Sequence, residues 1–422
     1  MRVIKNIARW SHAQKGGTQL LMVLISFISF SACSSDSELE PAVAEPTGVP
    51  VELQGYVAGY EDARKAATRA DSETYGVTRA WDVPTGFVSS AWFDDKFISV
   101  FFAREPKAPE TVESESYKLD MEEEFFYKSS GNWRVSKTNL TENSSNGINT
   151  YYLYGYVPHE QYVRPSIAHK GGSSDYADGA VLTLDSLNAI STVDYCVIVG
   201  AKDGTNADND NGLTRGQFTY TAGDHNYFFL LFDHLYASMN VNIKVNGVYA
   251  ALRTIKLKEL KLKIGSYDET PDSIALIKKK TKATITLTQT TEGADPISNV
   301  TFAPSAGFES NKADVAVGTL FYSKEGETLG TDNIDDMPYS CYFMAQDITH
   351  FILTSTYDIY DKKGNLIREG CTATNTIELA DLITAQTYAL RGRRYTINMT
   401  VNPTYLYMLS EPDLDSPTMV VN

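Results

Sequence analysis

Cysteine and basic residues are scarce in this sequence. Four cysteines among 422 residues are too few to cross-link a fold of this size. Lysine and arginine total 37 against 53 aspartate and glutamate residues, a formal net charge of −16, so we expect no nucleic-acid partner. Only four tryptophans accompany 26 tyrosines and 18 phenylalanines. Such a high content of tyrosine and phenylalanine favours β-structure over helix bundles.

Catalytic signatures are missing as well. There is no Gly-x-Gly-x-x-Gly, Walker loop or Gly-x-Ser-x-Gly, and the six histidines form no His-x-x-x-His pair. We interpret His234, which follows an apolar run, as a packing residue. The loop 208–212 looks like a calcium loop, but Gly212 at position six would place Ala207 and Phe218 at the two ends, where neither can bind the ion. We therefore predict that the protein is not an enzyme and has no cofactor or metal.

Residues 1–32 have the pattern of a secretory signal. Four basic residues and no acidic one precede an apolar stretch of about 13 residues, Leu20 to Ala32, whereas a membrane-spanning helix needs about 20. The stretch ends in Phe30-Ser31-Ala32-Cys33, which resembles the lipobox of bacterial lipoproteins, although leucine is commoner where Phe30 stands. The resemblance implies that Cys33 is lipidated and tethers the chain to outer-membrane lipid. The alternative is an ordinary signal with an incidental cysteine.

The polar, acidic residues after Cys33 resemble the export signal of Bacteroidales surface lipoproteins, so we expect a cell-surface location. Residues 33–48 are rich in Ser, Glu, Pro and Ala and are typical of a solvated tether. No later stretch is long and apolar enough to span a membrane.

The remaining chain is dominated by strand patterns. Apolar residues alternate with polar ones over 239–245, 283–287 and 395–401, as in half-buried strands. Over 255–264 the alternation changes phase, which predicts a β-bulge near Lys258-Glu259. Residues 361–365 are typical of a hairpin turn, and the apolar runs 195–199 and 227–232 predict strands covered on both faces. Short helices are expected only near 61–70 and 379–384.

Many short strands separated by turns favour β-sandwiches. We predict an all-β fold of two tandem sandwich domains, 49–227 and 228–422. Arg391, Arg393 and Arg394 are expected in a solvated turn. Cys341 and Cys371 flank the predicted hairpin without lying opposite each other, and whether they form a disulfide stays open.

Several segments together resemble the fimbrillin family, the subunits of Bacteroidales type V pili. Their order and spacing cover nearly the whole chain after the signal. The segments are Tyr151-Tyr152-Leu153-Tyr154-Gly155-Tyr156-Val157-Pro158, Phe232-Asp233-His234-Leu235-Tyr236-Ala237, and Gly392 to Tyr407 with Asp413-Leu414. Two Thr-Arg-Ala sequences, at 68–70 and 78–80, resemble the one that precedes the first body strand in many members.

This resemblance implies two transthyretin-like or Ig-like antiparallel sandwiches that polymerise by strand exchange with other pilin subunits. In that scheme a protease cuts after an arginine that follows the first strand, here Arg69 or Arg79. The first strand, which alternates at Val49, Val51 and Leu53, then leaves, and another subunit's C-terminal segment fills the groove. The donor candidates are Tyr405, Leu406, Tyr407, Met408, Leu409, Met419, Val420 and Val421.

Two functions are therefore considered. The first is a surface lipoprotein pilin, at the stalk, tip or anchor position of a fimbria, that supports adhesion to a host or glycan receptor. The alternative is a glycan-binding lipoprotein of a nutrient-uptake system, with Trp81, Trp92 and Trp133 as stacking platforms. The C-terminal apolar run can also complete its own sheet instead of a neighbour's.

Overall fold

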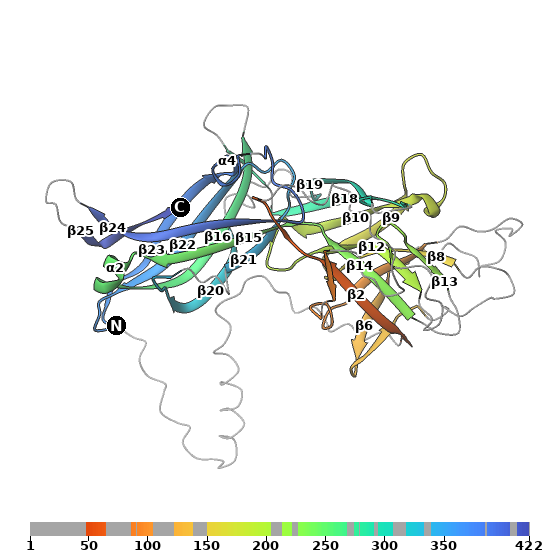
Figure 1. The fold of residues 1–422 in the computed structure, drawn as a ribbon, viewed down its shortest axis with the longest axis horizontal. Helices are drawn as coiled ribbons and strands as arrows, with labels where there is room; N and C mark the ends of the chain where they lie inside the picture. Colours follow the sequence, from red (N-terminus) through yellow and green to blue (C-terminus); the bar gives the residue numbers. More distant parts are fainter. Residues whose placement is uncertain are drawn as a thin grey trace, which may run out of the picture. The chain divides into compact units, whose positions relative to one another are not determined.

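The protein folds almost entirely into β-strands, which confirms the predicted all-β class (Figure 1). The computed structural model describes residues 48–64, 86–89, 91–103, 122–137, 150–203, 213–221, 227–267, 274–277, 279–290, 294–306, 318–332, 339–384, 386–405 and 412–421. Residues Gly48–Asn422 belong to one compact unit. The division into domains at residue 228 stays a prediction.

The largest sheet has ten strands among the described residues. It follows the order β1-β7-β6-β5-β8-β12-β14-β2-β4, and β13 also pairs with β8. In that order the strands are β1 (Val49–Pro50), β7 (Asn132–Val135), β6 (Glu124–Ser129), β5 (Ile98–Ala103), β8 (Thr150–Val157), β12 (Cys196–Asp203), β14 (Tyr227–His234), β2 (Glu52–Ala58), β4 (Phe87–Ser89) and β13 (Thr219–Thr221).

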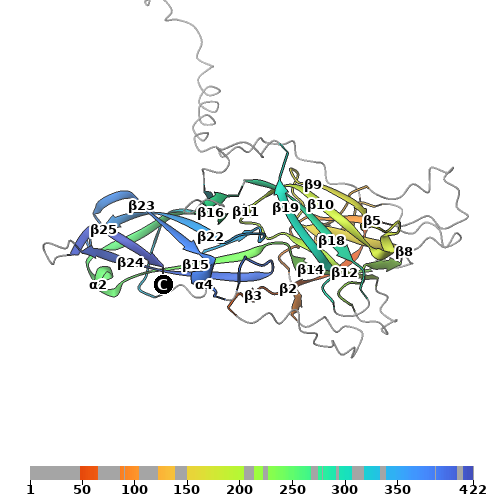
Figure 2. The same ribbon diagram turned by 90° about the horizontal axis from the view of Figure 1, so that it is seen from above.

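A four-stranded sheet lies against this ten-stranded sheet, with β10 in contact with β8 (Figures 1 and 2). Its strands, in spatial order, are β19 (Ile297–Pro304), β18 (Lys280–Thr288), β10 (Gly179–Asn188) and β9 (Arg164–His169). Strands β18 and β19 follow residue 228 in the chain, yet β18 pairs with β10, which precedes it, and β19 pairs with β18. Strands from before and after residue 228 therefore belong to the same sheet.

The other two sheets pack face to face through Phe343, Phe351 and Tyr395, whose rings lie 5.3–6.2 Å apart. The six-stranded sheet contains β11 (Ile190–Ser191), β21 (Tyr339–Phe343), β15 (Ala237–Val245), β24 (Arg393–Tyr405) and β25 (Pro412–Val421) in that order, with β3 (Glu61–Asp62) paired to β24. The five-stranded sheet contains β17 (Ile274–Leu276), β16 (Thr254–Tyr267), β22 (His350–Tyr360) and β23 (Leu366–Glu378), with β20 (Thr319–Thr328) paired to β16.

Most of the local features predicted from the sequence are present in the structure. Strand β16 contains the predicted bulge, because its register against β22 shifts between Leu257 and Glu259. Strands β22 and β23 form the predicted hairpin around residues 361–365. The apolar strands β12 and β14 are buried on both faces over most of their lengths, as predicted.

Helices are short throughout the described part. They are the 3₁₀ turn η2 (Tyr176–Asp178), α2 (Gly247–Leu252) and α4 (Leu379–Leu382), the last within the predicted range 379–384. The helix expected near residue 61 is wrong at its start, because Glu61 and Asp62 form β3. Within the described residues, no helix has the length and apolar character needed to cross a membrane.

The sheets are mixed and not purely antiparallel. Among the strands that the structure describes, three pairs run parallel: β14 with β2, β15 with β24, and β24 with β3. Parallel neighbours need a long connection between them, and these connections join strands that are far apart in the sequence. Two of these three pairs involve residues 52–63, which also contribute to the candidate site.

Candidate functional site

Strand β2 is the first long strand of the described chain and lies close to the edge of the ten-stranded sheet. It pairs in parallel with β14 from Glu52, opposite Tyr227, to Val57, opposite Phe232. On its other side the three-residue strand β4 meets only the last three residues of β2. The alternating pattern of β2 buries Leu53 and Val57 and exposes Glu52 and Gln54, as expected for a strand with one face in the core.

The chain that follows β2 fastens the N-terminal segment to the six-stranded sheet. The backbone N–H of Glu61 donates to Gly392 O at 3.0 Å, and that of Ala63 donates to Arg394 O at 3.0 Å. Arg393 Nη1 lies 3.0 Å from Glu61 Oε2, and the Arg393 side chain is only 6% exposed. We call residues 52–63 the N-terminal segment. This segment therefore binds to both the ten-stranded and the six-stranded sheet.

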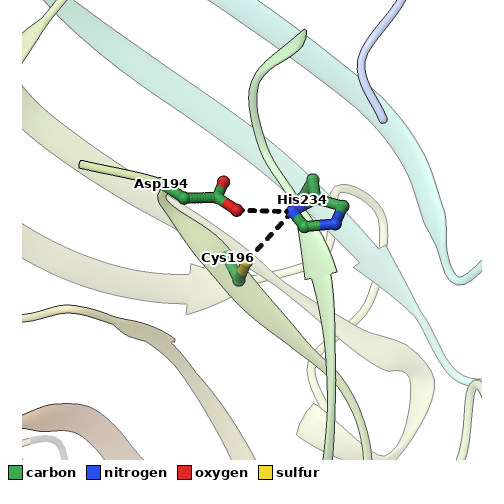
Figure 3. Close-up of side chains that lie close together, drawn as sticks. All are labelled: Asp194, Cys196 and His234. Atoms are coloured by element: carbon green, nitrogen blue, oxygen red, sulfur yellow. Dashed lines mark hydrogen bonds and ion pairs between the residues drawn. The ribbon is translucent and has the colours of Figure 1, made fainter. Parts of the chain in front are cut away.

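Asp194, Cys196 and His234 cluster beside this segment (Figure 3). Cys196 begins β12 and His234 ends β14, and the two residues lie directly opposite each other in the antiparallel pair. His234 Nδ1 lies 2.9 Å from Asp194 Oδ2 and 3.4 Å from Cys196 Sγ. Cys196 is fully buried, and the side chains of His234 and Asp194 are 4% and 14% exposed.

The N-terminal segment completes the surroundings of this cluster. His234 Nε2 lies 2.5 Å from Ala58 O, so that nitrogen carries a proton and donates it. The Tyr60 ring stacks on the imidazole with centroids 3.6 Å apart, and its hydroxyl donates to Asp194 Oδ1 at 2.7 Å. Burial, followed by the negative charge of Asp194, raises the pKa of Tyr60 well above its ordinary value. Tyr60 therefore stays a neutral donor.

The geometry of the cluster does not suit nucleophilic catalysis. In a catalytic relay the two imidazole nitrogens serve different partners, the nucleophile on one and the orienting carboxylate on the other. Here both Cys196 and Asp194 lie against Nδ1, and the fully buried thiol cannot meet a substrate. What the three donor atoms can do is bind a proton or a metal ion, since they lie within 4.8 Å of one another.

A buried ionic network lies next to the cluster. Asp233, which is fully buried, accepts from Arg215 at 2.7 Å and from Arg391 at 3.2 Å. Asp295 also accepts from Arg215, at 2.9 Å, and forms an ion pair with Arg391. Burial alone would lower the pKa of Arg391, but the two carboxylates hold it above its ordinary value. The network joins β14 to the loops that precede β19 and β24.

This network corrects one sequence prediction. Arg391, Arg393 and Arg394 were expected in a solvated turn, but Arg391 pairs with two carboxylates and Arg393 is buried against Glu61. Arg394 is exposed and lies over the Tyr60 ring, with the guanidinium carbon 5.8 Å from the ring centroid. Carboxylates distant in the sequence attract these side chains, and the local sequence gives no sign of them.

The predicted modification and donor residues fall in different places. Cys33, Arg69, Arg79 and the donor candidates Leu406, Tyr407, Met408 and Leu409 lie outside the described residues. Tyr405 is the last residue of β24. Met419, Val420 and Val421 lie in β25, which pairs antiparallel with β24, with Met419 buried and Val420 exposed. In this structure the C-terminal strand completes its own sheet.

The structure gives little support to the predicted sugar-stacking tryptophans and no sign of a disulfide among the described cysteines. Trp133 is 8% exposed and packs in the core, Trp92 is half-buried, and Trp81 lies outside the described residues, as does the loop 208–212. A buried ring such as Trp133 cannot serve as a sugar-stacking platform. Cys196, Cys341 and Cys371 form no disulfide.

The Asp194–Cys196–His234 cluster is what sequence reasoning missed. Cys196 was interpreted as a core residue and His234 as a packing residue, and each interpretation describes its burial correctly. A usable signal existed nonetheless. If two neighbouring apolar strands pair antiparallel, the start of one meets the end of the next, so Cys196 and His234 come together. The contribution of Tyr60 could not be inferred, because it depends on the parallel pairing of β2 with β14.

Comparisons with known proteins find only solved structures of low similarity. No protein-family model and no curated protein matches the sequence. Similar solved structures include a candidate cell adhesion protein of Bacteroides ovatus, with 13% identity, coverage of 89% of this chain and 95% of that chain, and a TM-score of 0.35.

A fimbrial protein of Bacteroides vulgatus has 12% identity over 73% of this chain and 85% of that one, with a TM-score of 0.33. The fimbrial anchor protein Mfa2 of Porphyromonas gingivalis has 10% identity over 88% and 97%, with a TM-score of 0.24. With identities and TM-scores this low, these likenesses carry no weight in the proposal below.

Proposed function

We propose that this protein is a structural subunit of a cell-surface fimbria, at the stalk, tip or anchor position, and that it supports adhesion. In this proposal the chain is exported as a lipoprotein, lipidated at Cys33 and carried to the outside of the outer membrane. Processing after Arg69 or Arg79 and strand exchange with other pilin subunits then build the polymer. No catalytic step is involved.

One observation supports the proposal: the N-terminal segment contributes strands to two sheets and precedes both candidate cleavage residues in the chain. Strand β2 contributes a parallel partner to β14 and is covered only briefly by β4. Arg69 and Arg79 lie between β3 and β4 in the chain, so a cut after either would separate β2 and β3 from the rest of the protein. Only non-covalent contacts would then hold the segment.

Loss of the N-terminal segment would create a groove that favours a new strand. The N–H and C=O groups of β14 that face β2 would lose their partners, and an unpaired edge of this kind recruits another strand. Leu53 and Val57 are 8% and 5% exposed, so their pockets would open to water. Burial of two such side chains by a replacement strand contributes roughly 3–6 kcal/mol before the cost of association, in addition to the restored backbone hydrogen bonds.

The C-terminal strand is a suitable donor once it is released from its own sheet. Strand β25 lies at the edge of the six-stranded sheet and presents Val420, which is 44% exposed. Two side chains of the facing sheet hold it, Asn375 through Met419 O at 2.9 Å and Tyr357 through Pro417 O at 3.4 Å. A head-to-tail contact of this kind does not close on itself and therefore produces a filament.

The processing step is tested by replacing both Arg69 and Arg79 with alanine and measuring the mature size on intact cells. We expect precursor-length protein that does not enter filaments. Arg64→Ala is the matched control, because Arg64 also follows the first strand and is exposed but does not stand in a Thr-Arg-Ala sequence. A double variant with the wild-type mature size and normal filaments would exclude cleavage at these residues.

Lipid anchoring is tested separately through Cys33→Ala. We expect the variant to appear in the soluble fraction, because stable anchoring of a lipoprotein depends on its acyl chains. Cys371→Ala, at a half-buried thiol distant in the sequence, is the control and should stay in the membrane fraction. A Cys33 variant that remains membrane-bound would refute the lipoprotein assignment.

A further inference from the structure

Three metal-ligating side chains converge where the N-terminal segment leaves the ten-stranded sheet. We propose that Asp194, Cys196 and His234 form a binding site for a divalent transition-metal ion, and that Zn²⁺ is the ion that fits best. A carboxylate oxygen, a thiolate sulfur and an imidazole nitrogen are all common zinc ligands. This inference does not depend on the proposed function, since it rests only on the cluster and its neighbours.

The two distances from His234 Nδ1 to the other donor atoms are close to those of a tetrahedral site. Zn–N and Zn–S bonds of ordinary length place the two donors about 3.5 Å apart, and His234 Nδ1 lies 3.4 Å from Cys196 Sγ. The corresponding N···O separation is about 3.3 Å, against 2.9 Å between Nδ1 and Asp194 Oδ2. For this pair of atoms a withdrawal of the carboxylate by a few tenths of an ångström is sufficient, and all three donor atoms lie within 4.8 Å of one another. Three protein donors leave one tetrahedral position for a further ligand.

The groups around these donors also match a metal site. A histidine that binds a metal usually donates its other N–H to a carbonyl or carboxylate, and a ligating carboxylate is usually hydrogen-bonded in turn. Here His234 Nε2 donates to Ala58 O, and Asp194 Oδ1 accepts from the Tyr60 hydroxyl. These contacts leave His234 Nδ1 facing both Asp194 Oδ2 and the Cys196 thiol (Figure 3).

A bound Zn²⁺ ion would leave no uncompensated charge in the buried cluster. Its two positive charges balance the thiolate of Cys196 and the carboxylate of Asp194, and His234 binds as a neutral imidazole through Nδ1. The proton that the thiol gives up passes to the solvent. Burial of the ion therefore adds no net charge.

The proposed site also connects the metal ion to the N-terminal segment. Ala58 and Tyr60 supply the two hydrogen bonds that orient the ligands, and both belong to this segment. Whatever removes the segment removes these bonds, and the metal affinity should then fall by about 10–100-fold. Conversely, bound metal should hold the segment in place.

Calorimetric titration of the full, untagged chain with Zn²⁺ after chelator treatment tests the proposal. We expect one ion per chain and an increase of roughly 3 °C in Tm at a free-metal concentration of about 100 Kd. Co²⁺ in place of Zn²⁺ should give a thiolate-to-cobalt absorption band. Cys196→Ser should abolish this band and the one-to-one binding, while Cys341→Ser, at an equally buried thiol outside the cluster, should keep both.

Milder variants keep the test decisive if Cys196→Ser does not fold. Tyr60→Phe retains the ring that stacks on His234 and removes only the hydroxyl that binds Asp194, so we expect a folded protein with about 10–100-fold weaker binding. Asp194→Asn should weaken binding further. No uptake of Zn²⁺ or Co²⁺ by the wild-type chain, or uptake that is equal in Asp194→Asn, would overturn the proposal and leave a buried imidazole in contact with a carboxylate and a thiol.

Discussion

Retention of the N-terminal segment after a cut should depend on Leu53. Its side chain is 8% exposed and packs in the core on the inward face of β2. Leu53→Ala removes buried methyl groups and leaves a cavity, which costs about 2–5 kcal/mol. If an engineered protease site replaces residues 69–80 and is then cut, only non-covalent contacts hold the segment. The cost of Leu53→Ala then appears as weaker binding of the segment. A loss of about 3 kcal/mol corresponds to roughly 100-fold faster release.

The assay follows release of the cleaved segment from the purified protein. A fluorophore at the N-terminus of the segment and an excess of unlabelled 48–64 peptide give the dissociation rate directly. Gln54→Ala is the matched control, because Gln54 is the next residue of the same strand and is exposed. We expect the control to change the rate by less than about threefold, as is usual for surface substitutions. Equal release rates for the Leu53 and Gln54 variants would refute the reasoning.

Two further predictions concern stability, measured by urea unfolding. Arg391→Met deprives the fully buried Asp233 of one of its two arginines, so we expect a loss of about 3 kcal/mol, against less than about 0.5 kcal/mol for the exposed Arg164→Met. Similar losses in both variants would show that the ionic network contributes nothing specific. Gly155→Ala should cost about 1–3 kcal/mol or more, because its Cβ would lie 2.1 Å from the Ser99 carbonyl oxygen, while Gly171→Ala, which meets nothing within 4 Å, should be close to neutral. Unchanged unfolding midpoints in both glycine variants would contradict the close approach of β5 and β8.

Features that depend on neighbouring residues could be predicted from the sequence. The phase change around Lys258-Glu259 is a local signal, and the register shift of β16 occurs there. Residues 361–365 connect β22 and β23 in the same way, because a short polar turn between two apolar strands permits few alternatives. Alternation also identified the buried faces of β15 and β24.

Pairings between distant strands could not be predicted. Nothing near Leu53 indicates that it lies beside Phe228, and nothing near Leu182 indicates that it lies beside Ile285. Alternation specifies which face of a strand is buried, but not which strand is its neighbour. The Asp194–Cys196–His234 cluster depends on such a pairing, as does the contact with Tyr60. The candidate site was therefore recognisable only as separate buried residues.

The most direct test of the central claim is mass spectrometry of filaments sheared from intact cells. Our account predicts that this chain is a component of the filaments. It should begin at Ala70 or Ala80 if it is a processed subunit, and at lipidated Cys33 if it is the anchor. Recovery of the chain only as a monomer, absent from the filament fraction, would contradict the account.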